Sequence, residues 1–276
     1  MTFDDRDRES VVRDLASSNE DARRLAVERV GVFPLDEALP LLVERLGDAS
    51  WRVRKVAVER LVACPDSERI ASTLVAALGD GENPGRRNSA VEALVHCGPR
   101  VVPGLLEATA SHDIDVRKLV VDALAGIADA RSSDTLVDLL GDPDPNVRAA
   151  SADALGAVGG EGVAEALLAL GVRAGEDHLV RFSALHALGC LEAPVRARDL
   201  APVLDDPILR AAGLDLLGWQ DEDEAVAVLL KGLAASSRSS RESAMRSLLR
   251  LFSRVDDARA DRLVGQIREA AVASLW

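Results

Sequence analysis

The chain has 276 residues and a formal net charge of −13. This acidic balance disfavours nucleic acid or an anionic membrane as the main partner, because both attract lysine and arginine. Nearly half of the residues are hydrophobic, yet the chain has only four Phe, three Trp and no Tyr. The core must therefore be built from Leu, Val and Ala, and the absence of alternating β-branched runs predicts helices rather than sheets.

The cysteines and the first residues bear on the compartment. Cys64, Cys97 and Cys190 are odd in number and widely spaced, so neither a disulfide framework nor a zinc site is expected. No apolar run is long enough to cross a membrane, and the initial segment MTFDDRDRES is charged where a signal peptide would be apolar. We therefore expect a cytoplasmic protein.

An arginine recurs eight times along the chain, at spacings of 29–33 residues. The copies are Arg23, Arg54, Arg87, Arg117, Arg148, Arg181, Arg210 and Arg241. Four residues before each arginine is a residue that favours the N-cap of a helix: Asn19, Ser50, Asn83, Asp113, Asp144, Asp177, Asp206 and Ser237. Seven residues after each arginine is Val30 or a leucine. The sequence therefore predicts eight capped helices in one register.

A second apolar segment precedes each capped helix, and we interpret it as the antiparallel partner of that helix. After the eighth pair, residues 258–274 predict an amphipathic capping helix through Leu263, Ile267, Ala271 and Leu275. No linker or low-complexity stretch interrupts the pattern, so we expect a single domain over residues 1–276. Its repeats are expected at approximately 8–31, 36–63, 67–97, 100–128, 132–159, 161–191, 196–219 and 222–254.

The most regular copy carries a family resemblance. Residues Asp144-Pro145-Asn146-Val147-Arg148, followed by Ala152 and Ala154-Leu155-Gly156, resemble the HEAT-like repeats first associated with phycobilisome lyases. The resemblance covers nearly the whole chain. It implies an all-α fold of the armadillo-like class, a right-handed α-solenoid (superhelix) of about eight antiparallel helix pairs. First helices would line the convex side and second helices the concave side. It implies little about chemistry, because this repeat serves many functions.

Features present in several copies are interpreted as structural. Each recurring arginine is expected to pack its stem between repeats, while its guanidinium binds carboxylates or carbonyls of the turns. The cysteines follow the arginine by nine or ten residues, where other copies have Ile127 and Val158, so they are predicted to be core residues. Trp51 and Trp219 are likewise expected to pack within the structure.

The face of each second helix that points away from the core carries the residues one and five positions after the arginine. In the first four copies these residues are Arg24 and Glu28, Lys55 and Glu59, Asn88 and Glu92, and Lys118 and Asp122. Three of the four are opposite charges spaced i, i+4, which is typical of a solvated helix face.

Copies five to seven break this pattern. The two positions hold Ala149 and Asp153, then Phe182 and His186, then Ala211 and Asp215, while Leu179 and Ile208 lie two residues before their arginines. We predict an apolar strip bordered by acidic residues, which favours a protein-binding surface. Self-association through the strip, or its coverage by the turn at 171–178, are alternatives.

The sequence offers little catalytic chemistry. None of the four histidines (His96, His112, His178 and His186) precedes a glutamate, so the His-Glu dyads of HEAT-like di-iron hydroxylases are missing. A metal site at His178 and His186 with Asp177 or Asp215 has weak support. No phosphate-binding loop, dinucleotide fingerprint or G-x-S-x-G motif occurs. We expect no catalytic residue, cofactor or metal.

The hypothesis is thus a non-catalytic, cytoplasmic scaffold or adaptor that binds a protein partner through its concave face. The candidate residues are Leu179, Phe182, His186, Ile208, Ala211, Asp215, Ala149 and Asp153. The alternative is a lyase- or DNA-glycosylase-type enzyme built on HEAT-like repeats. Against a glycosylase, the acidic residues of the second helices would repel phosphate, and Trp51 and Trp219 lie five repeats apart.

Overall fold

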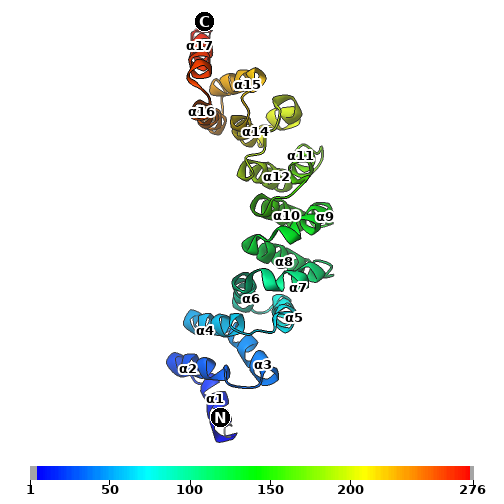
Figure 1. Ribbon diagram of the computed structural model, residues 1–276, viewed down its shortest axis with the longest axis vertical. Helices are drawn as coiled ribbons and strands as arrows, with labels where there is room; N and C mark the ends of the chain where they lie inside the picture. The colour runs from blue at the N-terminus through cyan, green and yellow to red at the C-terminus, as the bar shows by residue number, and fades with distance from the viewer. Residues whose placement is uncertain (1–4, 274–276) are drawn as a thin grey trace. The chain divides into compact units, whose positions relative to one another are not determined.

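The computed structural model describes the backbone of residues 5–273 and the side chains of residues 6–269. Within that range every regular element is an α-helix or a short 3-10 helix, and no strand occurs (Figure 1). The predicted all-α class is therefore confirmed. Of the residues assigned to the capping helix, Leu275 and the side chain of Ala271 lie outside the described part of the chain.

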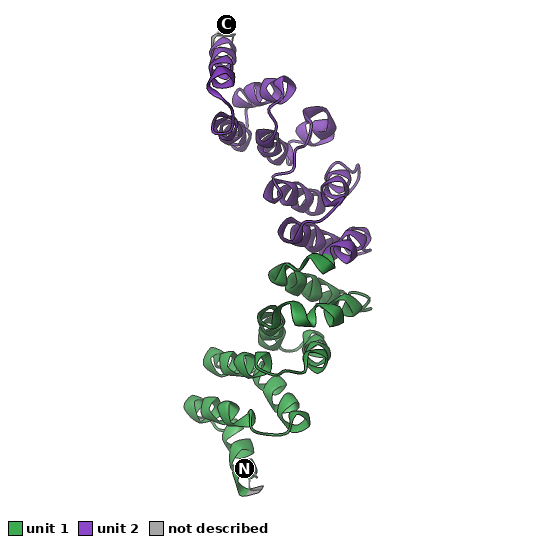
Figure 2. Cartoon of the chain, viewed as in Figure 1, with its two compact units in different colours: residues 1–132 green, residues 133–276 purple. Residues whose placement is uncertain are grey.

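The chain forms two compact units, residues 1–132 and 133–276 (Figure 2). The division falls at the start of the fifth predicted repeat, so each unit contains four whole repeats. Each unit is a stretch of α-solenoid in which helix pairs stack on one another.

Unit 1 contains four helix pairs. Its elements are α1 (Asp5–Leu15), α2 (Glu20–Val30), α3 (Leu35–Arg45), α4 (Trp51–Val62), α5 (Ser67–Leu78), α6 (Pro84–Cys97), η1 (Gly98–Val101), α7 (Val102–Ala108), α8 (Ile114–Ile127) and η2 (Ala130–Ser132). The second helices α2, α4, α6 and α8 contact one another in sequence, and each also contacts the first helix of its own pair. In Figure 1 the second helices α2, α4 and α6 lie on one side of the unit, with α3, α5 and α7 on the other.

Unit 2 repeats this arrangement. Its elements are α9 (Ser133–Asp138), η3 (Leu139–Gly141), α10 (Pro145–Val158), α11 (Val163–Gly171), α12 (His178–Cys190), η4 (Ala197–Leu200), α13 (Ala201–Leu204), α14 (Arg210–Leu216), η5 (Leu217–Trp219), α15 (Asp223–Leu233), α16 (Arg238–Phe252) and α17 (Asp257–Ala273). The second helices α10, α12, α14 and α16 again pack in succession. The helix α17 contacts α15 and buries Leu263 completely, as a capping helix should.

The predicted N-caps start the second helices in all but one copy. The side chains of Asn19, Ser50, Asn83, Asp113, Asp144, Asp177 and Ser237 accept hydrogen bonds from amides of the first turn. In the seventh copy α14 begins at Arg210 instead of directly after Asp206. The Asp206 carboxylate still accepts a hydrogen bond from the Ile208 amide at 2.9 Å. It therefore caps the turn that precedes α14.

The core of both units is aliphatic and follows the repeat. The leucines seven residues after the recurring arginines are buried. Leu61 in unit 1 and Leu188 in unit 2, for example, have no exposed surface. These positions lie on the helix face that packs against the first helix of the pair. The hydrophobic register read from the sequence therefore places the core correctly.

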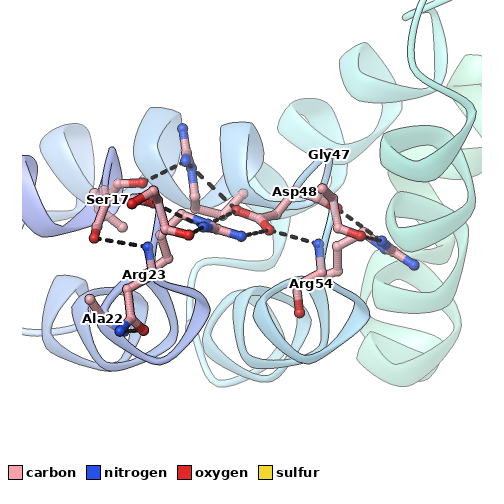
Figure 3. Close-up of polar contacts among 12 residues, drawn as sticks. Ser17, Ala22, Arg23, Gly47, Asp48 and Arg54 are labelled. Carbon is pink, nitrogen blue, oxygen red and sulfur yellow. Dashed lines mark hydrogen bonds and ion pairs between the residues drawn. The ribbon is translucent and has the colours of Figure 1, made fainter.

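The recurring arginine forms the predicted structural contact. In six copies its guanidinium donates to the carbonyl oxygen six residues earlier, at 2.7–2.9 Å. These copies are Arg23, Arg54, Arg117, Arg148, Arg210 and Arg241. Figure 3 shows Arg23 and Arg54 in unit 1, where Arg23 also binds both carboxylate oxygens of Asp48, at 2.8 and 3.0 Å. The arginine thus fixes the turn before its own helix and links that helix to the next repeat.

The other two copies bind different acceptors. Arg87 pairs with Asp115 at 3.2 Å, while Arg181 donates to the Gly171 carbonyl and to Asp206, each at 3.0 Å. Both arginines still connect neighbouring repeats, so the structural interpretation extends to them.

Two predictions about packing are wrong. Cys64 and Cys97 are buried as expected, but Cys190 is exposed. Cys190 follows its arginine by nine residues and the others follow by ten, and one residue turns a helical side chain by about 100°. Trp51 is 63% exposed, because it is the first residue of α4 and no preceding helical turn covers it.

Two of the three predicted charge pairs on the outer face of unit 1 are formed. Arg24 binds Glu28 at 2.5 Å and Lys118 binds Asp122 at 2.7 Å. Lys55 is exposed, and no ion pair joins it to Glu59 among the described residues. This face of unit 1 is solvated, as the sequence predicts.

Candidate functional site

The large apolar side chains of the predicted strip are exposed in unit 2. The exposed fractions are 54% for Leu179, 49% for Phe182 and 68% for Ile208. Leu179 and Phe182 lie in the first two turns of α12, and Ile208 precedes α14. We call these three residues the apolar strip.

The turn at 171–178 does not cover the strip. Its Glu176 carboxylate accepts a hydrogen bond from the Arg148 guanidinium at 2.6 Å, and its Asp177 caps α12. The hydrogen bond from Arg148 lowers the pKa of Glu176 and outweighs the opposing effect of burial. The turn is therefore held by its own polar contacts, and the alternative of coverage by this turn is wrong.

Ala149 does not belong to the exposed surface. It is only 5% exposed, although it occupies the same repeat position as Phe182. A Cβ atom on Gly156 would lie 3.0 Å from the Cα atom of Ala187, so α10 and α12 pack closely. A methyl side chain at the border of such closely packed helices does not reach solvent. Ala149 is therefore a core residue, and its assignment to the binding surface is corrected.

The polar neighbours of the strip lie near it. Asp153 on α10 is exposed and accepts a hydrogen bond from the Ser183 hydroxyl at 2.9 Å. His186 stacks on Phe182 with ring centroids 6.3 Å apart, and its Nδ1 atom lies 3.7 Å from Asp153. Cys190 Sγ lies 3.9 Å from the other ring nitrogen of His186. The strip therefore ends in a small polar cluster on the exposed face of α12.

A pocket of about 380 Å³ adjoins this cluster. It lies among α12, α14 and α16, and its lining includes Phe182, His186, Ala211 and Asp215 from the predicted set. Ala211 and Asp215 are half-buried. Four predicted residues therefore come together in one concave feature, and Leu179 and Ile208 are not among its lining residues.

The sequence did not indicate the far wall of this pocket. Trp219 follows α14, and Arg246 and Arg250 come from α16, which was not assigned to the site. The guanidinium carbon of Arg250 lies 4.3 Å from the Trp219 ring centroid, and that of Arg254 lies 4.9 Å away. An aromatic ring under two cations is a stable arrangement.

One sequence signal could have revealed this wall. The position five residues after the recurring arginine is acidic in most copies but is Arg246 in the eighth. Arg246 donates to both carboxylate oxygens of Asp215, at 3.0 and 3.2 Å, and the Ser243 hydroxyl donates to Asp215 at 2.9 Å. The charge reversal in copy eight therefore marks a contact between α14 and α16.

The histidines do not gather a metal site in the described part of the chain. His178 lies 3.1 Å from Asp206, whereas His186 approaches Asp153. No group of three or more His, Cys, Asp or Glu side chains within the described residues has a geometry that could hold a metal ion. Among these residues, no helix is both long and apolar enough to cross a lipid bilayer.

The sequence model of HEAT repeats matches residues 10–95 and 102–189. The chain belongs to the HEAT-repeat family. The matched residues include α12 with Phe182 and His186, whereas α14 and α16 lie beyond them.

Solved structures with a similar fold have low sequence identity to this HEAT-repeat protein. YibA of Escherichia coli is 18% identical with a TM-score of 0.51, and the match covers 88% of this chain and 91% of that one. The karyopherin Kap121p bound to the SUMO protease Ulp1p is 12% identical with a TM-score of 0.51. That match covers 99% of this chain and 44% of Kap121p.

A further structure is the complex of CpcE and CpcF of phycocyanin lyase from Nostoc sp. PCC7120. It is 22% identical, covers 87% of this chain and 98% of that one, and has a TM-score of 0.41. No curated protein matches the chain. The family and the two structures at a TM-score of 0.51 establish the fold, which is compatible with protein binding.

Proposed function

We propose that this protein is a non-catalytic scaffold that binds a partner protein through the second-helix face of unit 2. The observation that carries the proposal is the exposure of Leu179, Phe182 and Ile208 together on a face that is charged in unit 1. Exposed apolar side chains rimmed by polar groups are typical of protein interfaces.

The fold supports this role. A solenoid presents its second helices as an extended surface, and each repeat can vary its outer residues without changing the core. Kap121p, which resembles this chain in fold, was solved bound to another protein. A role in the cytoplasm is part of the proposal, and the three free cysteines are typical of a reducing compartment.

The proposal is tested by the substitution Phe182→Asp. A charge at the centre of an apolar contact should weaken partner binding at least about thirtyfold, which corresponds to about 2 kcal/mol. The immobilised wild-type chain and variant are incubated with an extract of the source organism, and proteins retained by each are quantified by mass spectrometry. The affinity of the protein identified in this way is then measured for both chains by calorimetry.

Leu25→Asp is the matched control. Leu25 lies on α2 in unit 1 and is 49% exposed, as Phe182 is. The partner should be retained by wild type and Leu25→Asp and lost from Phe182→Asp, with all three chains equally helical by circular dichroism. Equal retention by Phe182→Asp, or a loss of helicity in that variant, would show that Phe182 is not a binding residue.

A further inference from the structure

The charges around the pocket of unit 2 are unevenly neutralised. Its two carboxylates already have partners, because Asp215 pairs with Arg246 and Glu242 pairs with Arg238 at 2.6 Å. The bond from Arg238 also lowers the pKa of Glu242, which keeps this group ionised. Neither acidic side chain of the pocket is therefore without a cation.

The arginines at the Trp219 end have no such neutralisation. Arg250 donates to the backbone carbonyl of Asp215 at 2.9 Å, and no carboxylate lies within ion-pair distance of it in the described residues. Arg254 is exposed and contacts the Trp219 ring, and it too lacks a carboxylate partner in that range. A chain of net charge −13 thus presents a local positive surface beside an apolar pocket.

Beyond Trp219 the charges are balanced, with Asp221, Asp223 and Asp256 beside Arg254, Arg259 and Arg262. This tryptophan also lines a second, polar pocket of about 620 Å³ beside α15, α16 and α17. In that pocket Arg259 is neutralised by Asp221 at 2.7 Å and Asp223 at 2.8 Å, but Arg254 also faces it. Trp219 therefore lines both pockets, and Arg254, which lines the polar one, contacts its ring.

We propose that this surface binds an acidic peptide segment with a bulky apolar anchor residue; the inference rests on the proposed function and specifies its partner. The anchor occupies the pocket against Phe182 and Trp219, where the burial of apolar area favours binding. Acidic residues next to the anchor reach Arg250 and Arg254, whose attraction sets specificity and association rate. A short acidic segment meets only these local arginines, whereas a nucleic acid would extend its phosphates over the rest of this acidic chain, so a peptide fits better.

The probes are short fluorescein-labelled peptides whose binding to the full chain is followed by fluorescence anisotropy. The first carries a Leu and Phe anchor flanked by Glu, the second has Lys in place of Glu, and the third keeps Glu but replaces the anchor with Ser. The first peptide should bind at least about tenfold more tightly than the other two, and its affinity should fall as salt is added.

Arg254→Glu should weaken the first peptide about tenfold and strengthen the second. Arg60→Glu is the matched control, because Arg60 is an exposed arginine on a second helix of unit 1, and it should change neither affinity. Circular dichroism establishes that both variants keep wild-type helicity. An Arg254→Glu variant that keeps wild-type affinity for both peptides would overturn the proposal.

Further outcomes separate this inference from the proposed function. If the Lys peptide binds as tightly as the Glu peptide and Phe182→Asp abolishes both, the site stands and the acidic preference is wrong. If the Glu peptide binds Phe182→Asp as tightly as wild type, the site itself is wrong. The acidic-peptide inference also fails if no peptide binds or if oligothymidylate competes more strongly than the Glu peptide. It fails as well if light scattering shows a dimer that Phe182→Asp dissociates.

Discussion

The second helices α8 in unit 1 and α12 in unit 2 differ on their outer face. In α8, Lys118 and Asp122 form an ion pair at 2.7 Å across one helical turn. In α12 the same two repeat positions hold Phe182 and His186, whose rings stack. Both helices bury a leucine seven residues after the recurring arginine. The repeat thus fixes the core and leaves the outer face free to change, so function is best sought where the outer face departs from the repeat.

The largest expected effect tests whether the two units share one kind of core. Leu61→Ala in unit 1 and Leu188→Ala in unit 2 each remove a fully buried side chain. Each should lower the free energy of unfolding by about 2–5 kcal/mol, through lost burial and the cavity left behind. Urea denaturation followed by circular dichroism measures the loss. A negligible loss for either variant would contradict the equivalence of the two cores.

The next effect concerns the recurring arginine. Arg23→Met in unit 1 removes the partner of Asp48, whose side chain is only 4% exposed, so a nearly buried carboxylate loses its main cation. We expect a loss of about 2–3 kcal/mol in the free energy of unfolding.

The matched control for this effect is Arg241→Met in unit 2. Arg241 is exposed, and within the described part of the chain its guanidinium donates only to the Ala235 and Ser236 carbonyls, at 2.8 Å each. Its replacement should cost clearly less than that of Arg23, as measured by the same urea titration. Equal losses would mean that the link to Asp48 adds nothing to the contact with the turn.

The same ion pair predicts a dependence on pH. Burial alone would raise the pKa of Asp48, but hydrogen bonds from the Arg23 side chain and the Ser50 amide bring it below its ordinary value of 3.8. A carboxyl whose pKa is lowered by folding contributes stability above its unfolded pKa and loses it as the pH falls through the folded value. Acidification below about pH 4 should therefore destabilise the wild-type chain more than Asp48→Asn.

This dependence is measured from urea midpoints at neutral and acidic pH. At neutral pH, Asp48→Asn should be less stable than wild type because it has lost the charge that Arg23 binds. Toward acidic pH the two midpoints should converge. A constant difference between them at all pH values would show that Asp48 does not contribute to acid sensitivity.

The smallest expected effect is on the charged face of unit 1. Lys118→Ala removes the pair with Asp122 and should cost about 0.3–0.5 kcal/mol, less in high salt. Lys55→Ala is the control, because Lys55 makes no pair with Glu59. A double-mutant cycle with Asp122→Ala isolates the interaction. A coupling energy of zero would mean that this face is merely solvated.

The sequence by itself determined the repeat, the helix pairs and the core. Local chemistry explains this success: the side chains of residues such as Asp144 and Asn19 accept hydrogen bonds from the first turn of the helix that follows, and apolar spacing selects the buried face. It also located Phe182 and Leu179 on an exposed surface, because a large apolar residue in place of a charged one is visible in the register. Phe182 is exposed at the repeat position where Ala149, with only a methyl side chain, is buried.

Only the tertiary structure decided the details at the borders of that face. Ala149 is buried because α10 and α12 pack closely at Gly156. The pocket brings Phe182 beside Trp219 and Arg250, which lie far apart in the sequence. Helix periodicity states which way a side chain points, but the packing between helices determines what covers it and which distant residue it meets.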